Sequence, residues 1–163
     1  MSQVLILMGS DSDAPIMSAA VEVLNEFGIS SRMTVASAHR SPARVMRLID
    51  EAHNSGVRVF IVGAGAAAHL AGVVAAHTSL PVIGVPIDSS ALKGMDALLS
   101  TVQMPPGVPV ATVAIGKPGA TNAGVLAAQM IALADAGIAA KLVAYKKKLE
   151  DKVEAAAKKL EQA

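Results

Sequence analysis

Short apolar runs that do not alternate with polar residues restrict the fold of this chain more than any other feature. Four of them are Val4–Met8, Val57–Val62, Pro81–Val85 and Val110–Ile115. Strands that are covered on both faces have this pattern, whereas strands with one face in water alternate. We therefore predict that these runs, with a further strand over Arg32–Ser37, form a parallel sheet between two layers of helices.

Helical patterns lie between the predicted strands. Ser41 followed by Pro42, a pair typical of a helix start, precedes the second of them. Strand and helix alternate five times along the sequence. This order predicts a doubly wound α/β fold, of the Rossmann-type three-layer kind, with the flavodoxin-like strand order 2-1-3-4-5. Two of the helices each have one apolar face, formed by Ile16, Ala19, Ala20, Val23, Leu24 and Phe27 and by Val45, Leu48, Ile49 and Ala52.

The chain length predicts one domain over residues 1–163. Apolar residues that recur every three or four positions predict a helix over 138–161 at its end. One face of that helix is apolar and the other is rich in Lys and Glu, so it either packs on its own sheet or reaches a neighbouring subunit. Hydrophobic residues make up 53% of the chain and charged residues only 17%. This apolar composition predicts that part of the surface is buried against another subunit.

Charge and composition argue against several classes of partner. The net charge is +1 and aromatic residues make up 2% of the chain, which argues against a nucleic-acid partner. Residues 59–87 contain no Asp, Glu, Lys or Arg, but glycines, Pro81 and two histidines interrupt them. We expect strand, helix and strand there rather than a membrane span. The chain has no Cys, and no other residues have the spacing of a metal site.

Polar or small loops follow the first three predicted strands, at the edge where open parallel sheets bind ligands. Gly9–Asp13 offers hydroxyls and free amides to a phosphate, although Ser and Asp are also ordinary capping residues. Ser37–Pro42 contains Arg40, which can donate two hydrogen bonds to a phosphate, and His39, whose imidazole suits proton transfer near neutral pH. Gly63–His69 has small side chains that let an anionic group approach the backbone.

A dinucleotide site is an alternative interpretation of the third loop. Gly63–Ala68 satisfies the pattern G-x-G-x-x-A, and Asp88 follows the next strand. The pattern falls on the third strand rather than the first, and the chain leaves no room for a substrate domain. A nicotinamide or flavin nucleotide site is therefore the less favoured interpretation.

A phosphorylated receiver module is a second alternative, because Asp11 and Asp13 follow the first strand and Lys117 follows the fifth. Such a module needs a phosphate-accepting Asp after the third strand, where this chain has Gly-Ala-Gly. We interpret His53 and His77, which lie in no motif, as a helix-surface and a helix-end residue.

Together these segments resemble class I of the PurE family, the N5-carboxyaminoimidazole ribonucleotide mutases, nearly from end to end. Ala66 and Ala71 depart from the resemblance, since the family usually has Gly and Pro there. The motifs that carry it are Met8–Asp13, Ser37–Arg40, Gly63–Gly65, Ala67–Leu70, Ser90–Asp96, Val102–Pro105 and Gly107–Thr112.

The resemblance implies a reaction of purine biosynthesis in which a carboxyl group moves from the exocyclic nitrogen of a ribonucleotide to carbon 4 of its imidazole ring. It implies no metal, ATP or organic cofactor. The related class II carboxylases instead combine aminoimidazole ribonucleotide with carbon dioxide, and that activity remains the alternative.

The resemblance also implies roles for individual residues. His39 would be the general acid and base, Asp13 would bind the ribose hydroxyls, and His69 would have a secondary polar role beside the carboxyl group. The 5′-phosphate would be held by Ser10, Ser12 and Arg40, with Ser37 in support. The carboxyl pocket would be lined by Gly65 and the helix start from Ala66 to His69, and Leu70 would also bind the substrate. By the same resemblance we expect a cytoplasmic homo-oligomer, an octamer, whose partner is a small ribonucleotide.

Overall fold

The computed structural model describes residues 2–162, so residues 1 and 163 of the predicted domain lie outside the described part. The described residues form a five-stranded parallel sheet in the order β2-β1-β3-β4-β5, which confirms the predicted fold class. The strands are β1 (Val4–Met8), β2 (Ser31–Val35), β3 (Val59–Gly65), β4 (Val82–Ile87) and β5 (Ala111–Thr112). The helices are η1 (Asp11–Asp13), α1 (Ala14–Phe27), α2 (Pro42–Asn54), α3 (Leu70–Ala76), α4 (Met95–Val102), α5 (Gly116–Ala132) and α6 (Ala136–Glu161).

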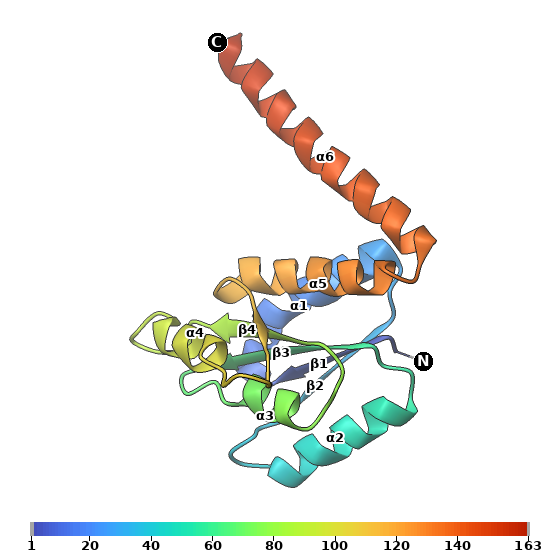
Figure 1. Cartoon of the computed structure of the whole chain (residues 1–163). Coiled ribbons are helices and arrows are strands. Elements are labelled where there is room, and N and C mark those ends of the chain that lie inside the picture. The colour runs from blue at the N-terminus through green and yellow to red at the C-terminus, as the bar shows by residue number, and fades with distance from the viewer. Residues whose placement is uncertain (1, 163) are drawn as a thin grey trace.

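Helices cover both faces of the sheet, with α1 and α5 on one face and α2 and α3 on the other (Figure 1). Successive side chains of each strand therefore enter different cores. In β1, Ile6 packs with the α1 and α5 layer, whereas Leu5 and Leu7 pack with the α2 and α3 layer. This two-sided burial explains why β1, β3 and β4 contain no alternating polar residues, whereas β2, at the edge of the sheet and only partly buried, does alternate.

The bounds of four strands differ from the prediction. β2 runs over Ser31–Val35 rather than Arg32–Ser37. β3 ends at Gly65 rather than Val62, because residues 63–65 pair with residues 85–87 of β4 and the neighbouring strand overrides the weak strand preference of glycine. β4 correspondingly extends to Ile87 rather than ending at Val85. At the edge of the sheet, β5 keeps only two of the six predicted residues, since the chain leaves β4 after Val113 and enters α5 at Gly116.

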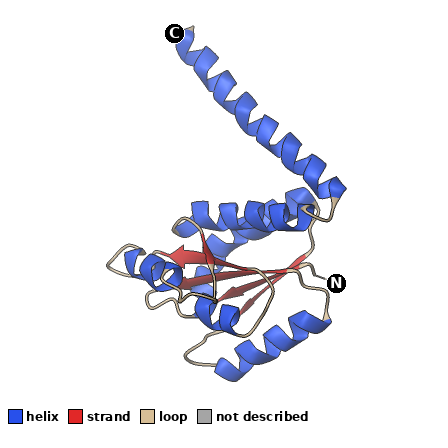
Figure 2. Ribbon diagram, viewed as in Figure 1, coloured by secondary structure: helices blue, strands red, loops and turns tan. Residues whose placement is uncertain are grey.

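The last helix, α6, extends away from the rest of the molecule (Figure 2). Only its first turns pack on the body, where Leu142 and Tyr145 contact the core of the α1 and α5 layer. Farther along, Val153 and Leu160 are 68% and 81% exposed. The helix therefore does not pack on its own sheet, which was one of the two predicted arrangements.

Within residues 2–162, no helix is long and apolar enough to cross a membrane. Residues 59–87, the uncharged segment, instead form β3, α3 and β4, as predicted.

Candidate active site

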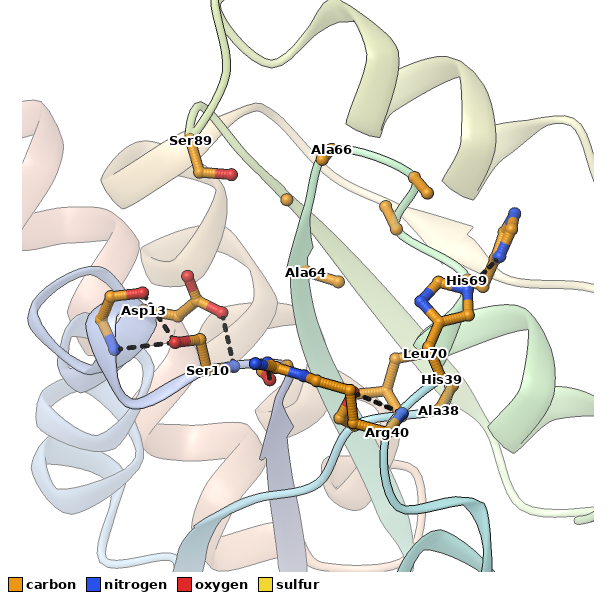
Figure 3. A pocket seen from close by; sticks show the side chains of 16 residues that line it. Ser10, Asp13, Ala38, His39, Arg40, Ala64, Ala66, His69, Leu70 and Ser89 are labelled. Carbon is orange, nitrogen blue, oxygen red and sulfur yellow. Dashed lines mark hydrogen bonds between the residues drawn. The ribbon is translucent and has the colours of Figure 1, made fainter.

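The carboxyl ends of β1, β2, β3 and β4 surround one cleft of about 250 Å³. This is the edge at which open parallel sheets bind ligands. Figure 3 shows the side chains that line it. The cleft brings together all ten residues that the sequence nominated: Ser10, Ser12, Asp13, Ser37, His39, Arg40, Gly65, Ala66, His69 and Leu70.

Hydrogen bonds from its own side chains hold the conformation of the loop after β1. Ser10 caps η1: the Ser12 N–H donates to Ser10 Oγ at 3.3 Å, and the Ser10 N–H donates to Asp13 Oδ2 at 3.1 Å. The two serine hydroxyls are 2.9 Å apart and both line the cleft. The capping interpretation of this loop is therefore correct, and the same caps hold two hydroxyls where a ligand would meet them.

Asp13 differs from the other residues of this loop because only 5% of it is exposed. Burial raises the pKa of its carboxyl above the ordinary value, the Ser10 N–H that donates to it lowers that pKa in part, and the charge of Asp11 raises it further. Asp13 still borders the cleft, so it offers a fixed acceptor to the hydroxyl groups of a ligand.

Arg40 connects the loops that follow β1 and β2. Its Nη2 donates to the Gly9 carbonyl oxygen at 3.1 Å, and its backbone N–H donates to Ser37 Oγ at 3.2 Å. The guanidinium is thereby held at the same end of the cleft as the hydroxyls of the β1 loop (Figure 3). A guanidinium and two hydroxyls together are suited to bind a phosphate group.

Ser41 occupies the N-cap position of α2, with Pro42 in the first turn, as predicted. Its side chain makes no capping bond to the helix. The hydroxyl instead accepts from the Ser37 N–H at 3.3 Å, which closes the turn that carries His39 and Arg40. Ser41 therefore helps to fix the loop conformation.

His39 and His69 form the most specific contact of the site. His39 Nε2 lies 2.6 Å from His69 Nδ1, and the two rings meet edge to face with their centroids 4.7 Å apart. At that distance one nitrogen donates and the other accepts, so a single proton lies between the rings. A pair of imidazoles that shares a proton beside a cleft can supply a proton to a ligand and recover it.

The loop after β3 is short, because Gly63–Gly65 belong to the strand rather than to a loop, contrary to the prediction. A Cβ on Gly63 would collide with the side chain of Met17 in the core. The first glycine of G-x-G-x-x-A therefore serves packing and not a phosphate, which argues against the dinucleotide interpretation. Ala66 and Ala68 follow in the left-handed region, with φ of 51° and 45°.

Ser89, directly after β4, also lines the cleft but was not among the predicted site residues. Its position after a strand end was the only available signal, and it stands outside the recognised loop motifs. His53 and His77 lie elsewhere, on the exposed face of α2 and at the end of α3, as predicted. Within residues 2–162, no three His, Cys, Asp or Glu side chains are arranged to hold a metal ion.

Comparisons with known proteins agree with this geometry. The family model described as AIR carboxylase matches residues 3–152. The N5-carboxyaminoimidazole ribonucleotide mutase of Thermotoga maritima is 51% identical over 162 residues, which are 99% of this chain and 94% of that protein.

Two further relatives span the same region. The phosphoribosylaminoimidazole carboxylase of Candida glabrata is 49% identical over 96% of this chain, a match that covers 27% of that longer protein. The crystal structure of Treponema denticola PurE superposes with a TM-score of 0.88 at 30% identity, over 96% of this chain and 97% of that one.

Proposed function

This chain belongs to the AIR carboxylase family, and on that premise we propose that it converts N5-carboxyaminoimidazole ribonucleotide to 4-carboxy-5-aminoimidazole ribonucleotide in purine biosynthesis. The observation that carries the proposal is the identity of about half of all residues, along nearly the whole chain, to a protein of that name. The enzyme is thus an isomerase.

The site residues can perform this reaction in two steps. His39, as its imidazolium, gives a proton to the exocyclic nitrogen while the bond from that nitrogen to the carboxyl carbon breaks and carbon dioxide is released. Carbon 4 of the ring then attacks the carbon dioxide, and His39 removes the proton from carbon 4. The imidazolium is restored, so no proton or electron is consumed, as general acid–base catalysis requires.

His69 supports this cycle through its contact with His39. Its Nδ1 fixes the orientation of the His39 ring at 2.6 Å, and as His39 gains or loses its proton the shared hydrogen bond can reverse direction. While the carboxyl group is still on the exocyclic nitrogen, His69 also has the secondary polar role beside it that the family resemblance implied.

The rest of the cleft binds the ribonucleotide. The hydroxyls of Ser10 and Ser12 and the Arg40 guanidinium hold the 5′-phosphate with support from Ser37, and Asp13 accepts hydrogen bonds from the ribose hydroxyls. The carboxyl pocket is formed by Gly65, Ala66 and Leu70. Small apolar side chains there keep water away from carbon dioxide between the two steps.

We also propose that residues 1–163 form one PurE-type domain that assembles into a cytoplasmic homo-octamer. Exposed apolar side chains support self-association, because a monomer would leave them in water. They lie on α6 and around α4, and include Leu92, Met95, Leu99, Val143 and Val153. In this assembly α6 packs on a neighbouring subunit.

The test is a direct assay with freshly made N5-carboxyaminoimidazole ribonucleotide and no added bicarbonate. Formation of the carbon-4 carboxylated product well above the spontaneous rate supports the mutase. Product that forms only from aminoimidazole ribonucleotide and excess bicarbonate would instead assign the carboxylase activity for which the Candida relative is named.

A pair of histidine variants separates the role of His39 from a general effect on folding. His39→Asn should lower turnover by about 100-fold or more, the usual loss when a general acid–base group is removed. His53→Asn is the matched control, since His53 is exposed on α2 and bonds Thr78 away from the cleft. Turnover by His39→Asn equal to that of the control would refute the assignment of His39.

A further inference from the structure

We propose that Ser89 is a substrate-binding residue of this site and that its hydroxyl hydrogen-bonds the carboxyl group that the reaction transfers. This inference rests on the proposed function and extends it to a fourth loop, the one that follows β4.

The hydroxyl of Ser89 is placed directly against the floor of the cleft. A Cβ on Gly65 would collide with Ser89 Oγ, so the hydroxyl occupies the space that the glycine leaves open. In Figure 3 the hydroxyl points inward over the end of β3. In the part of the chain that the structure describes, it makes no hydrogen bond, so it is available to a ligand.

The turn that carries Ser89 is held by its neighbours rather than by Ser89. Ser90 accepts from the Leu92 N–H at 3.2 Å through its hydroxyl and from the Lys93 N–H at 3.0 Å through its carbonyl. A hydrogen bond from the Ser90 side chain is also the main reason that the pKa of Asp96 is lowered. Replacement of Ser89 therefore leaves the hydrogen bonds of the turn intact.

The position of Ser89 relative to His39 matches the geometry of the second reaction step. After carbon dioxide has added, carbon 4 is tetrahedral and carries both a hydrogen and the carboxyl group, which point in different directions. His39 must face the hydrogen to remove it, so the carboxyl group points away from His39.

The wall away from His39 is the one that Ser89 provides. In the sheet, β2, which precedes His39, and β4, which precedes Ser89, lie on opposite sides of β3. Figure 3 shows His39 and His69 on one side of the end of β3 and Ser89 on the other. A hydroxyl there can donate to the carboxylate and keep it in place while the proton leaves.

The experiment compares the wild type with Ser89→Ala in calorimetric titrations with two ribonucleotides. One is 4-carboxy-5-aminoimidazole ribonucleotide, and the other is aminoimidazole ribonucleotide, which lacks the carboxyl group. Loss of a hydrogen bond to a charged group should weaken binding of the carboxylated compound by about 10-fold or more. Binding of the compound without the carboxyl group should be unchanged.

A turnover measurement with the same proteins provides a second result. Ser89→Ala should release a larger share of the consumed substrate as free aminoimidazole ribonucleotide, after correction for spontaneous decarboxylation. Ser89→Thr, which restores the hydroxyl, should recover both the binding preference and the share of product.

Two results would overturn the inference. Equal weakening for both ribonucleotides would make Ser89 a structural residue, and unchanged binding of both would remove it from the site. Wild-type turnover, measured in the same series, separates a failure of the Ser89 inference from a failure of the proposed mutase function. An active wild type with an unaffected Ser89→Ala variant refutes only the role of Ser89, whereas an inactive wild type refutes the proposed function.

Discussion

Ala66 offers a test of backbone strain in the cleft, because its φ of 51° lies in the left-handed region. That region is costly for a residue with a Cβ, by about 1–2 kcal/mol, and glycine adopts it without the penalty. Ala66→Gly should therefore stabilise the protein. Glycine is also the residue that the family usually has at this position.

The magnitude follows from comparison with Ala67→Gly. Both side chains are exposed, and Ala67 does not have a positive φ. Each substitution increases the entropy of the unfolded chain equally, at a cost of about 0.4–1 kcal/mol, so this cost cancels between the two variants. The remaining difference is the cost of the left-handed conformation, and Ala66→Gly should exceed Ala67→Gly in unfolding free energy by about 1–2 kcal/mol.

Calorimetric melting at one fixed protein concentration measures this difference. For a chain of this length, about 1 kcal/mol corresponds to about 2–4 °C in Tm. The fixed concentration removes the contribution of subunit association. Equal melting temperatures for the two variants, or a lower one for Ala66→Gly, would refute the strain argument.

Three further variants test the proposed roles. His69→Asn should lower kcat by about 10-fold and change the pH profile of kcat/KM, because it removes the ring that orients His39; an unchanged profile would contradict this. Asp13→Asn should weaken ribonucleotide binding yet stabilise the fold at neutral pH. Burial raises the pKa of Asp13, so its contribution to folding is present below the unfolded pKa and is lost as the pH rises through the folded pKa. The advantage of the Asn variant in Tm should grow as the pH rises above the ordinary carboxyl pKa of about 4, and a constant difference would contradict it. The double variant Leu149→Lys and Val153→Lys should sediment as a smaller species than the wild type, whereas an unchanged size would show that this face of α6 is not an interface.

The order of elements was predictable because it depends on periodicity. Apolar runs without polar alternation predicted strands buried on both faces, and the structure divides residues such as Leu5 and Ile6 between two cores. The last helix was predicted over 138–161 and begins at Ala136, because Asp135 caps it by accepting from the Ile138 N–H at 3.0 Å.

Strand ends were less predictable because pairing decides them. Glycine favours a turn by local preference, which placed the end of the third strand at Val62. In the folded chain Gly63 and Gly65 instead pair with β4, and each lacks a Cβ that would collide with a side chain from elsewhere, Met17 in one case and Ser89 in the other.

The strand order and the edge of the sheet that holds the site followed from the sequence pattern, because strand ends of a parallel sheet meet at one edge whatever the loops do. The ten nominated residues came from the family resemblance, and they are among the sixteen that line the cleft. Folding was needed to bring His39 within 2.6 Å of His69, thirty positions away, and to place the hydroxyl of Ser89 in the cleft. Such contacts form only when the distances between side chains on different loops are correct to within a few tenths of an ångström, and packing of the whole domain sets those distances.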